Sequence, residues 1–270
     1  MLSAVVAVFA AGAAVADDSH VHARLVSDFD PVDGGGRFHL GVVLEPEPGW
    51  HIYWRNPGGA GLATDVTFEL PEGFRAGELR WPTPVSFIQP GGIIGYGYES
   101  PVLLAAEVTA PDVTDRPVPV YVTASWLACK DICVLGEARL AAELPLDVAA
   151  RRRSAAAFEG WEASLPTAAE PGRVSISITG GPVAAGGTTA LVVWLQWSGA
   201  PANVEFFPDP GPALKVDNVR TRSRGQLTRV DIDVTRIQGT AEPAQSLSAV
   251  VVTTDGQGHR TGRPLTINLD

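Results

Sequence analysis

The chain has 270 residues with 30 acidic and 20 basic side chains, a formal net charge of −10 and two cysteines. It is long enough for two domains, each with a core of its own. The acidic balance and the lack of clustered lysine and arginine exclude a nucleic-acid surface. The one basic run, Arg151–Arg153, is expected to be the solvated face of a linker helix.

The N-terminal segment has the composition of a secretory signal peptide. Residues 2–13 are almost all apolar, and Ala14-Val15-Ala16 supplies a small-residue cleavage site, although no basic residue precedes the apolar run. We therefore expect export to the periplasm, with cleavage near Ala16. No later stretch approaches the ~20 consecutive apolar residues of a membrane-spanning helix. The mature chain is thus expected to be soluble, and any membrane partner to be a separate polypeptide.

Short runs of alternating apolar residues fill the first half of the chain. Turn-forming stretches such as 33–36, 46–49 and 56–59 separate them. About seven strands with frequent turns are typical of a β-sandwich, which we expect to span residues 17–147. The expected strands are residues 20–26, 37–44, 50–54, 64–70, 102–108, 118–127 and 137–146.

The third of these strands is rich in aromatic side chains. Trp50, Tyr53 and Trp54 could form a carbohydrate-stacking cluster in another fold. Alternation, however, places Trp50, Ile52 and Trp54 on one face of the strand. This pattern favours a sandwich core.

The pattern changes near Asp147, where Ala-rich sequence begins. Phe158, Trp161 and Leu165 follow at helical spacing, so they predict one apolar stripe. Asp147 can serve as the N-cap, and Pro166 as the terminator. We expect a helical connector over residues 148–166, within a linker of residues 148–168.

The period of two returns after the connector. Alternating runs begin at residue 174 and continue to the C-terminus, and they contain no cysteine. They predict a second, smaller β-sandwich over residues 169–270. The fold class expected for the whole chain is therefore all-β, with two sandwiches joined by a short helical connector.

The two cysteines provide the only candidate chemistry in the chain. The expected strand ending at Leu127 leads directly into Cys129-Lys130-Asp131-Ile132-Cys133. The cysteines are therefore expected at a strand end or hairpin, where a partner could reach them. A secreted disulfide scaffold would contain more cysteines, so this pair is not the framework of the fold.

The spacing of the pair favours thiol exchange over a structural bridge. A disulfide across so short a loop removes little entropy from the unfolded chain, about 2 kcal/mol. Exchange chemistry, in contrast, needs one thiolate that attacks a partner and a neighbour that resolves the mixed disulfide. Lys130 would favour a thiolate at Cys129, whereas Asp131 would oppose it. The residues alone leave three alternatives: a redox relay, a structural disulfide and a metal site.

Histidines suggest a second, weaker metal alternative. His20 and His22 share a face of the first expected strand, and His39 lies on the next one. A surface copper or zinc site is conceivable there. A single methionine argues against dedicated Cu(I) handling. No phosphate loop, Ser/His/Asp order or convincing carboxylate pair is present, so we expect no cofactor and no hydrolase activity.

Four motifs, taken in order, resemble the N-terminal periplasmic domain of the DsbD/ScsB protein-disulfide reductases. The resemblance covers roughly residues 20–147. The motifs are WHIYWRNPG at 50–58, WPTP at 81–84, GYGY at 95–98 and WLACKDIC at 126–133. In that family the domain is an immunoglobulin-like sandwich that receives electrons from a transmembrane domain and passes them to periplasmic thioredoxin-like proteins.

The resemblance implies that Cys129 and Cys133 are the shuttled pair of a thiol:disulfide oxidoreductase component. The second sandwich is similar to the enlarged N-terminal region of ScsB-like members. The family's membrane domain and C-terminal thioredoxin domain do not follow in these 270 residues. The expected partners are therefore a membrane-embedded thiol reductase, either a separate chain or the missing domains, and thioredoxin-like client proteins.

The family also shields its cysteines with a cap loop that carries aromatic residues. Residues 91–98 are our candidate, because the glycines permit movement and Tyr96 and Tyr98 could cover sulfur. The alternative is a Gly-rich turn with two packed tyrosines. We expect Trp126, Lys130 and Asp131 to complete the surroundings of the active site.

Overall fold

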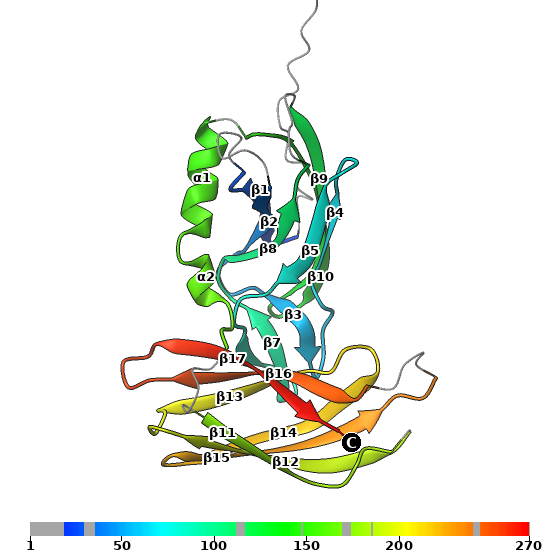
Figure 1. Ribbon diagram of the computed structural model, residues 1–270, viewed down its shortest axis with the longest axis vertical. Coiled ribbons are helices and arrows are strands. Elements are labelled where there is room, and N and C mark those ends of the chain that lie inside the picture. Colours follow the sequence, from blue (N-terminus) through cyan, green and yellow to red (C-terminus); the bar gives the residue numbers. More distant parts are fainter. Residues whose placement is uncertain are drawn as a thin grey trace, which may run out of the picture. The chain divides into compact units, whose positions relative to one another are not determined.

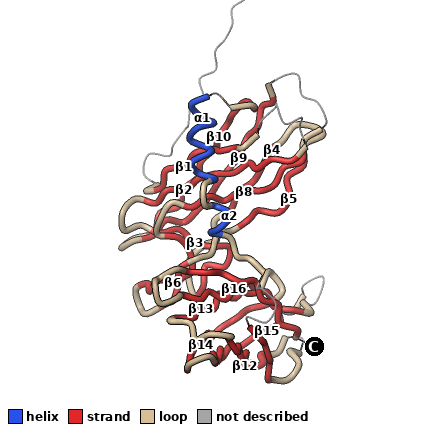
Figure 2. The backbone as a smooth tube through the Cα atoms, turned by 60° about the vertical axis from the view of Figure 1, so that its left-hand side comes forward, coloured by secondary structure: helices blue, strands red, loops and turns tan. Residues whose placement is uncertain are grey.

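The computed structural model describes residues 19–29, 36–111, 117–146, 148–168, 174–184, 186–239 and 244–269. The expected signal peptide, residues 1–16, and the expected N-cap Asp147 lie outside the described residues. Strands dominate the described part of the chain, and two short helices follow one another between its halves (Figure 2). The predicted all-β class is therefore confirmed.

The chain divides into two compact units. The N-terminal unit comprises the described residues up to Ile52, Thr64–Arg80 and Tyr98–Glu159. The C-terminal unit comprises Tyr53–Ala63, Trp81–Gly97 and the described residues from Gly160 onward. Two segments from the first half of the sequence thus group with the second sandwich. The boundaries expected from sequence, at residues 147 and 169, stay a prediction.

The N-terminal unit contains two antiparallel sheets. One has the strand order β1-β2-β8-β5. In the other, β9 pairs with β10, with β4 and with the first two residues of β3. The bounds are β1 Val21–Ser27, β2 Arg37–Pro46, β3 His51–Gly58, β4 Asp65–Glu69, β5 Arg75–Arg80, β8 Val102–Thr109, β9 Val118–Cys129 and β10 Cys133–Leu144.

The core of this unit follows from period-two alternation. Along β9 the side chains of Val118, Val120, Val122 and Ala124 are buried, while the residues between them are more exposed. Buried residues of β2 and β8, among them Leu40 and Leu104, come from the other sheet. On β3, Ile52 of this unit is buried, and so are Tyr53 and Trp54, which belong to the C-terminal unit. The expected core role of this aromatic strand is confirmed.

The helix α1 (Val148–Phe158) packs along β1 (Figure 1). The buried hydroxyl of Ser154 accepts a hydrogen bond of 3.2 Å from the backbone N–H of Ser27. Arg151–Arg153 are exposed, as expected. The single helix predicted over 148–166 is wrong in one respect. Gly160, with φ of 73°, separates α1 from a one-turn helix α2 (Trp161–Ser164).

The C-terminal unit has two further antiparallel sheets, ordered β11-β12-β15-β14 and β13-β16-β17. Their inward residues, such as Val193, Phe206, Ile232 and Leu247, form one buried cluster. The bounds are β11 Val174–Thr179, β12 Thr188–Trp197, β13 Asn203–Asp209, β14 Leu214–Arg224, β15 Leu227–Arg236, β16 Ser246–Thr254 and β17 Arg260–Asn268.

The hairpin of β6 (Val85–Gln89) and β7 (Ile93–Tyr98) also contributes to the C-terminal unit. Ser86 donates a hydrogen bond of 2.8 Å to Glu205. Arg260 binds both the Pro84 carbonyl and the Glu205 carboxylate, at 2.9 and 2.8 Å. These contacts explain why a segment from the first half of the sequence groups with the second sandwich.

Four strands have no counterpart in the sequence prediction: β5, β6, β7 and β14. In β5 nearly every side chain is exposed, and β14 carries charged or polar residues at most positions. Neither has the apolar alternation on which the prediction depended. Among the described residues, no helix has the length and apolar character needed to span a membrane.

Candidate functional site

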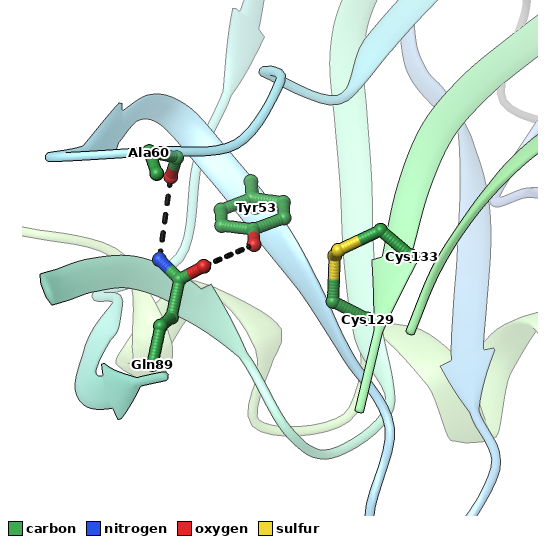
Figure 3. The surroundings of a disulfide bond; sticks show 5 residues. All are labelled: Tyr53, Ala60, Gln89, Cys129 and Cys133. Carbon is green, nitrogen blue, oxygen red and sulfur yellow. Dashed lines mark hydrogen bonds between the residues drawn. A yellow bond between two sulfur atoms is a disulfide. The ribbon is translucent and has the colours of Figure 1, made fainter. Parts of the chain in front are cut away.

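The candidate site lies at the end of the hairpin formed by β9 and β10. The twelve residues of each strand pair in continuous register, and the last pair is Cys129 with Cys133. A disulfide joins them, with an S–S distance of 2.06 Å and a Cα–Cα distance of 4.1 Å (Figure 3). The N–H of Lys130 donates to the carbonyl of Ile132, at 3.0 Å, and closes the three-residue loop. The hairpin register therefore brings the two sulfurs together.

The two cysteines differ in accessibility. Cys129 is 2% exposed, whereas Cys133, the first residue of β10, is exposed. A sulfur of another molecule can therefore approach Cys133 more easily than Cys129. The difference matters because thiol–disulfide exchange depends on which sulfur can be attacked.

The exposed sulfur has apolar neighbours. Ile132 is 65% exposed and Leu135 is 71% exposed. Leu135 pairs across the hairpin with Leu127, two residues before Cys129, so the two leucines share the face of the paired cysteines. Apolar side chains beside a reactive sulfur offer contact area to a partner protein.

The charged residues of the loop are both exposed. Lys130 extends toward the turn between β2 and β3, where its Nζ would lie 3.1 Å from a Cβ placed on Gly49. Gly49 has φ of 84°, which favours glycine at this point. Asp131 lies at the outer end of the loop. Lys130 and Asp131 are thus both beside the cysteines, as the sequence predicted from adjacency.

His51 lies in the motif at 50–58, but nothing in the sequence placed it at the site. This residue pairs with Cys129 across β3 and β9. Residues directly opposite in an antiparallel pair point to the same face, so the imidazole and the Cys129 side chain share one side of the sheet. Burial lowers the pKa of His51 below its ordinary value. No signal in the sequence could show this pairing, since the register of distant strands is a tertiary property.

Trp126 supports the hairpin from the face opposite Cys129. It is three residues from Cys129 on the same strand, so their side chains point to opposite faces. Its indole is 3% exposed. It lies over Gly136, its register partner, where a Cβ would collide with the indole nitrogen. Trp126 is therefore close in sequence to the cysteines, but it packs on the other side of the strand.

The two tyrosines of the expected cap are buried. Tyr96 and Tyr98 lie on β7 and are 7% and 6% exposed. The Tyr96 ring packs edge-on against Phe207, with 5.1 Å between ring centroids, and burial raises its pKa to about 12. Both tyrosines are packed, as in the alternative interpretation, but they lie on a strand rather than in a Gly-rich turn. A cap role for the segment stays a prediction.

Tyr53 on β3 belongs to a chain of hydrogen bonds that reaches the turn after this strand. Tyr53 donates a hydrogen bond of 2.9 Å to the Gln89 side chain, whose amide donates in turn to the Ala60 carbonyl at 3.3 Å (Figure 3). Burial raises the pKa of Tyr53. The phenol is therefore neutral near pH 7.

The histidines considered for a surface metal site have other partners. The Nδ1 of His20 lies 2.8 Å from Glu47, and the Nδ1 of His39 lies 2.8 Å from Asp28. Within the described part of the chain, no group of three or more His, Cys, Asp and Glu side chains could hold a metal ion.

Comparisons with known proteins agree with this geometry. Residues 23–145 match the family model described as the N-terminal part of the thiol:disulfide interchange protein DsbD. No curated protein sequence matches the chain. The crystal structure of the N-terminal periplasmic domain of ScsB from Proteus mirabilis has a similar fold, with a TM-score of 0.66 and 22% identity. The likeness covers 94% of this chain and 96% of that one.

The ScsB likeness extends over both units, and at this identity it concerns the fold alone. The family match contains both cysteines and three strands that surround them, β3, β9 and β10. The resemblance predicted from four sequence motifs is therefore confirmed for residues 23–145, which match the family model of the DsbD N-terminal part.

Proposed function

We propose that this protein relays electrons in the periplasm, through reversible oxidation of Cys129 and Cys133. The observation that supports the proposal best is the exposed Cys133 in a disulfide at a hairpin end. The family match adds to it, since it covers the hairpin. The buried Cys129 is suited to the resolving role, because a partner sulfur reaches it only through Cys133.

The proposed reaction begins with the reduced protein. The Cys133 thiolate attacks a sulfur of a client disulfide, and one client sulfur leaves as a thiolate. The Cys129 thiolate then attacks Cys133. The Cys129–Cys133 bond forms, the bond to the client breaks, and the second client sulfur leaves as a thiolate. Two electrons pass to the client, which becomes a dithiol, while this protein becomes the disulfide.

The expected partners are a membrane-embedded thiol reductase and thioredoxin-like clients. The family match and the periplasmic origin of the ScsB domain support this assignment. Ile132 and Leu135 give a client an apolar surface beside Cys133. A reductase would attack the same exposed sulfur and reduce the disulfide, so the two partners would bind one after the other.

The test is a single-turnover transfer experiment. The reduced protein is mixed with an oxidised thioredoxin-fold protein, the mixture is quenched with an alkylating agent, and free thiols are counted on each chain by mass spectrometry. We expect two thiols to appear on the client for each pair lost here. A variant with both cysteines changed to serine is the matched control. Transfer no greater than in this control would reject the proposal.

A further inference from the structure

The short pairing between β3 and β9 determines the surroundings of the buried sulfur. It consists of two register pairs, His51 with Cys129 and Ile52 with Ala128. Ile52 and Ala128 are both fully buried in the core of the N-terminal unit. Because alternate residues of a strand point to opposite faces, His51 and Cys129 share the face that points away from this core. Directly opposite residues have Cβ atoms about 4.5–5.5 Å apart.

The resolving step needs a charged sulfur at a buried position. Only the thiolate attacks a disulfide, yet Cys129 is 2% exposed. Burial penalises the charged form and raises the pKa of a thiol. The exposed Cys133 has no such penalty. A group that removes the Cys129 proton would therefore help the second half of the reaction more than the first.

Other titratable groups lie near Cys129 or His51 along the chain, and most are unsuited to accept the proton. Lys130 is a cation above Gly49; it can stabilise a thiolate but takes no proton when charged. Tyr53, two residues along β3 from His51, is a neutral phenol with a raised pKa. Glu47, in the turn before β3, pairs with His20. Asp131 is exposed at the outer end of the loop, and an exposed carboxylate is a weak base.

We infer that His51 accepts the proton of Cys129 when the mixed disulfide is resolved, an assignment that rests on the proposed function. In this step the Cys129 proton moves to the imidazole and the thiolate attacks Cys133. The Cys129–Cys133 bond forms, the bond between Cys133 and the client breaks, and the client sulfur leaves as a thiolate. That thiolate is protonated by the imidazolium or by water, so His51 returns to its neutral form.

Burial supports this role, because it lowers the pKa of His51 and so keeps the imidazole neutral near pH 7 in the disulfide form. In the reduced form a Cys129 thiolate on the same face would favour the imidazolium. The pKa of His51 is therefore expected to be higher in the reduced protein than in the oxidised protein.

The first experiment measures Cys129 without any client. In a Cys133→Ser background, the thiolate absorbance of Cys129 is titrated with pH, with and without His51→Gln. We expect His51→Gln to raise the pKa of Cys129 by about one unit or more. The control is His22→Gln, on the exposed face of β1. An unchanged Cys129 pKa in the His51 variant would overturn the assignment.

The second experiment separates the two halves of the reaction. Reduced protein is mixed with dithiobis(nitrobenzoic acid), which releases one coloured thiolate when Cys133 attacks and another when Cys129 resolves. We expect His51→Gln to slow the second release about tenfold and to leave the first unchanged. Equal slowing of both releases, or of neither, would contradict the inference.

The test does not depend on a folded His51→Gln variant, since the pKa of His51 can also be measured by NMR in the unmodified oxidised and reduced protein. A higher pKa in the reduced form is expected, and equal values would overturn the assignment. Failure of the proposed function would give a different result from failure of this inference. In that case no thiols pass to a protein client, while the Cys129 titration still decides the role of His51.

Discussion

Each unit contains a long hairpin that can be compared at its tip, β9–β10 in the N-terminal unit and β14–β15 in the C-terminal unit. β9 and β10 end in a three-residue loop that a disulfide closes, with Ile132 and Leu135 exposed beside it. β14 and β15 end in a tight turn of Gly225 and Gln226. Both hairpins are antiparallel strand pairs that end in a short loop. The comparison teaches that the sulfur pair and the exposed apolar side chains, rather than the hairpin itself, provide the proposed activity.

The β14–β15 hairpin carries ion pairs on its outer face, as β10 does with Arg139 and Glu137. Asp231 of β15 binds Arg229 at 2.5 Å and lies 3.8 Å from Arg222, and the hydrogen bond from Arg229 is the main cause of its lowered pKa. These exposed pairs suit a solvated surface and add little stability. The β14–β15 hairpin therefore supplies matched control positions for each test of the β9–β10 hairpin.

The largest expected effect comes from exchanging the cysteines one at a time. Cys133→Ser should abolish transfer of thiols to a client, because the exposed sulfur is lost. Cys129→Ser should instead accumulate a mixed disulfide between Cys133 and the client. Mass spectrometry under non-reducing conditions measures both. The control Gln226→Ser, at the tip of β14–β15, should transfer normally, and a mixed disulfide that formed only through Cys129 would reverse the assigned roles.

The cores of the two units can be compared by cavity-forming substitutions. Leu104 and Ile232 are 0% and 1% exposed, one in each unit. Changing either to alanine should lower the free energy of unfolding by about 2–5 kcal/mol, measured by denaturant titration. Folded Ile232→Ala should retain thiol transfer, since the sulfur pair belongs to the other unit. A loss below ~1 kcal/mol would show that the site is not tightly packed.

Reduction of the disulfide should have a smaller effect on stability. The bridge closes a loop of five residues, from Cys129 to Cys133. Loop closure of this size is worth about 2 kcal/mol. Denaturant titration with and without a reductant should show a loss of that order, while the reduced protein stays folded. Unfolding on reduction would show that the bridge is structural, and it would remove the dithiol state that the relay requires.

The smallest effect concerns the exposed apolar side chains near Cys133. Ile132→Ser and Leu135→Ser should each slow transfer to a protein client about three- to tenfold, without changing the free energy of unfolding. Reaction with a small disulfide should be unaffected, since it needs no contact surface. The control is Leu227→Ser at the end of β14–β15, where Leu227 is 39% exposed. Equal slowing by all three variants would contradict a docking role.

Sequence alone predicted the strands that alternate clearly. β9 is an example, since its apolar residues recur at every second position up to Trp126. β14, with the sequence LKVDNVRTRSR, was missed because its stability comes from pairing with β15 rather than from an apolar face. The predicted connector failed at Gly160, where left-handed backbone interrupts the helix. Local patterns cannot show such tertiary pairing.

The same limit applies to the site. Adjacency along the chain predicted the cysteine pair with Lys130 and Asp131, and it also suggested Trp126, whose side chain points to the opposite face. His51 lies 78 positions before Cys129 in the sequence, and only the register of β3 with β9 brings them together. Residues that are neighbours across a sheet have no spacing signal of their own.

The central claim is that the Cys129–Cys133 bond exchanges reversibly in the folded protein. Its reduction potential tests this most directly: the protein is equilibrated in a series of glutathione redox buffers, quenched by alkylation, and the reduced fraction is counted. The account predicts a potential above about −300 mV, within reach of periplasmic thiol partners. A pair that stays oxidised in every buffer down to about −300 mV would be a structural bridge, and the relay would be contradicted.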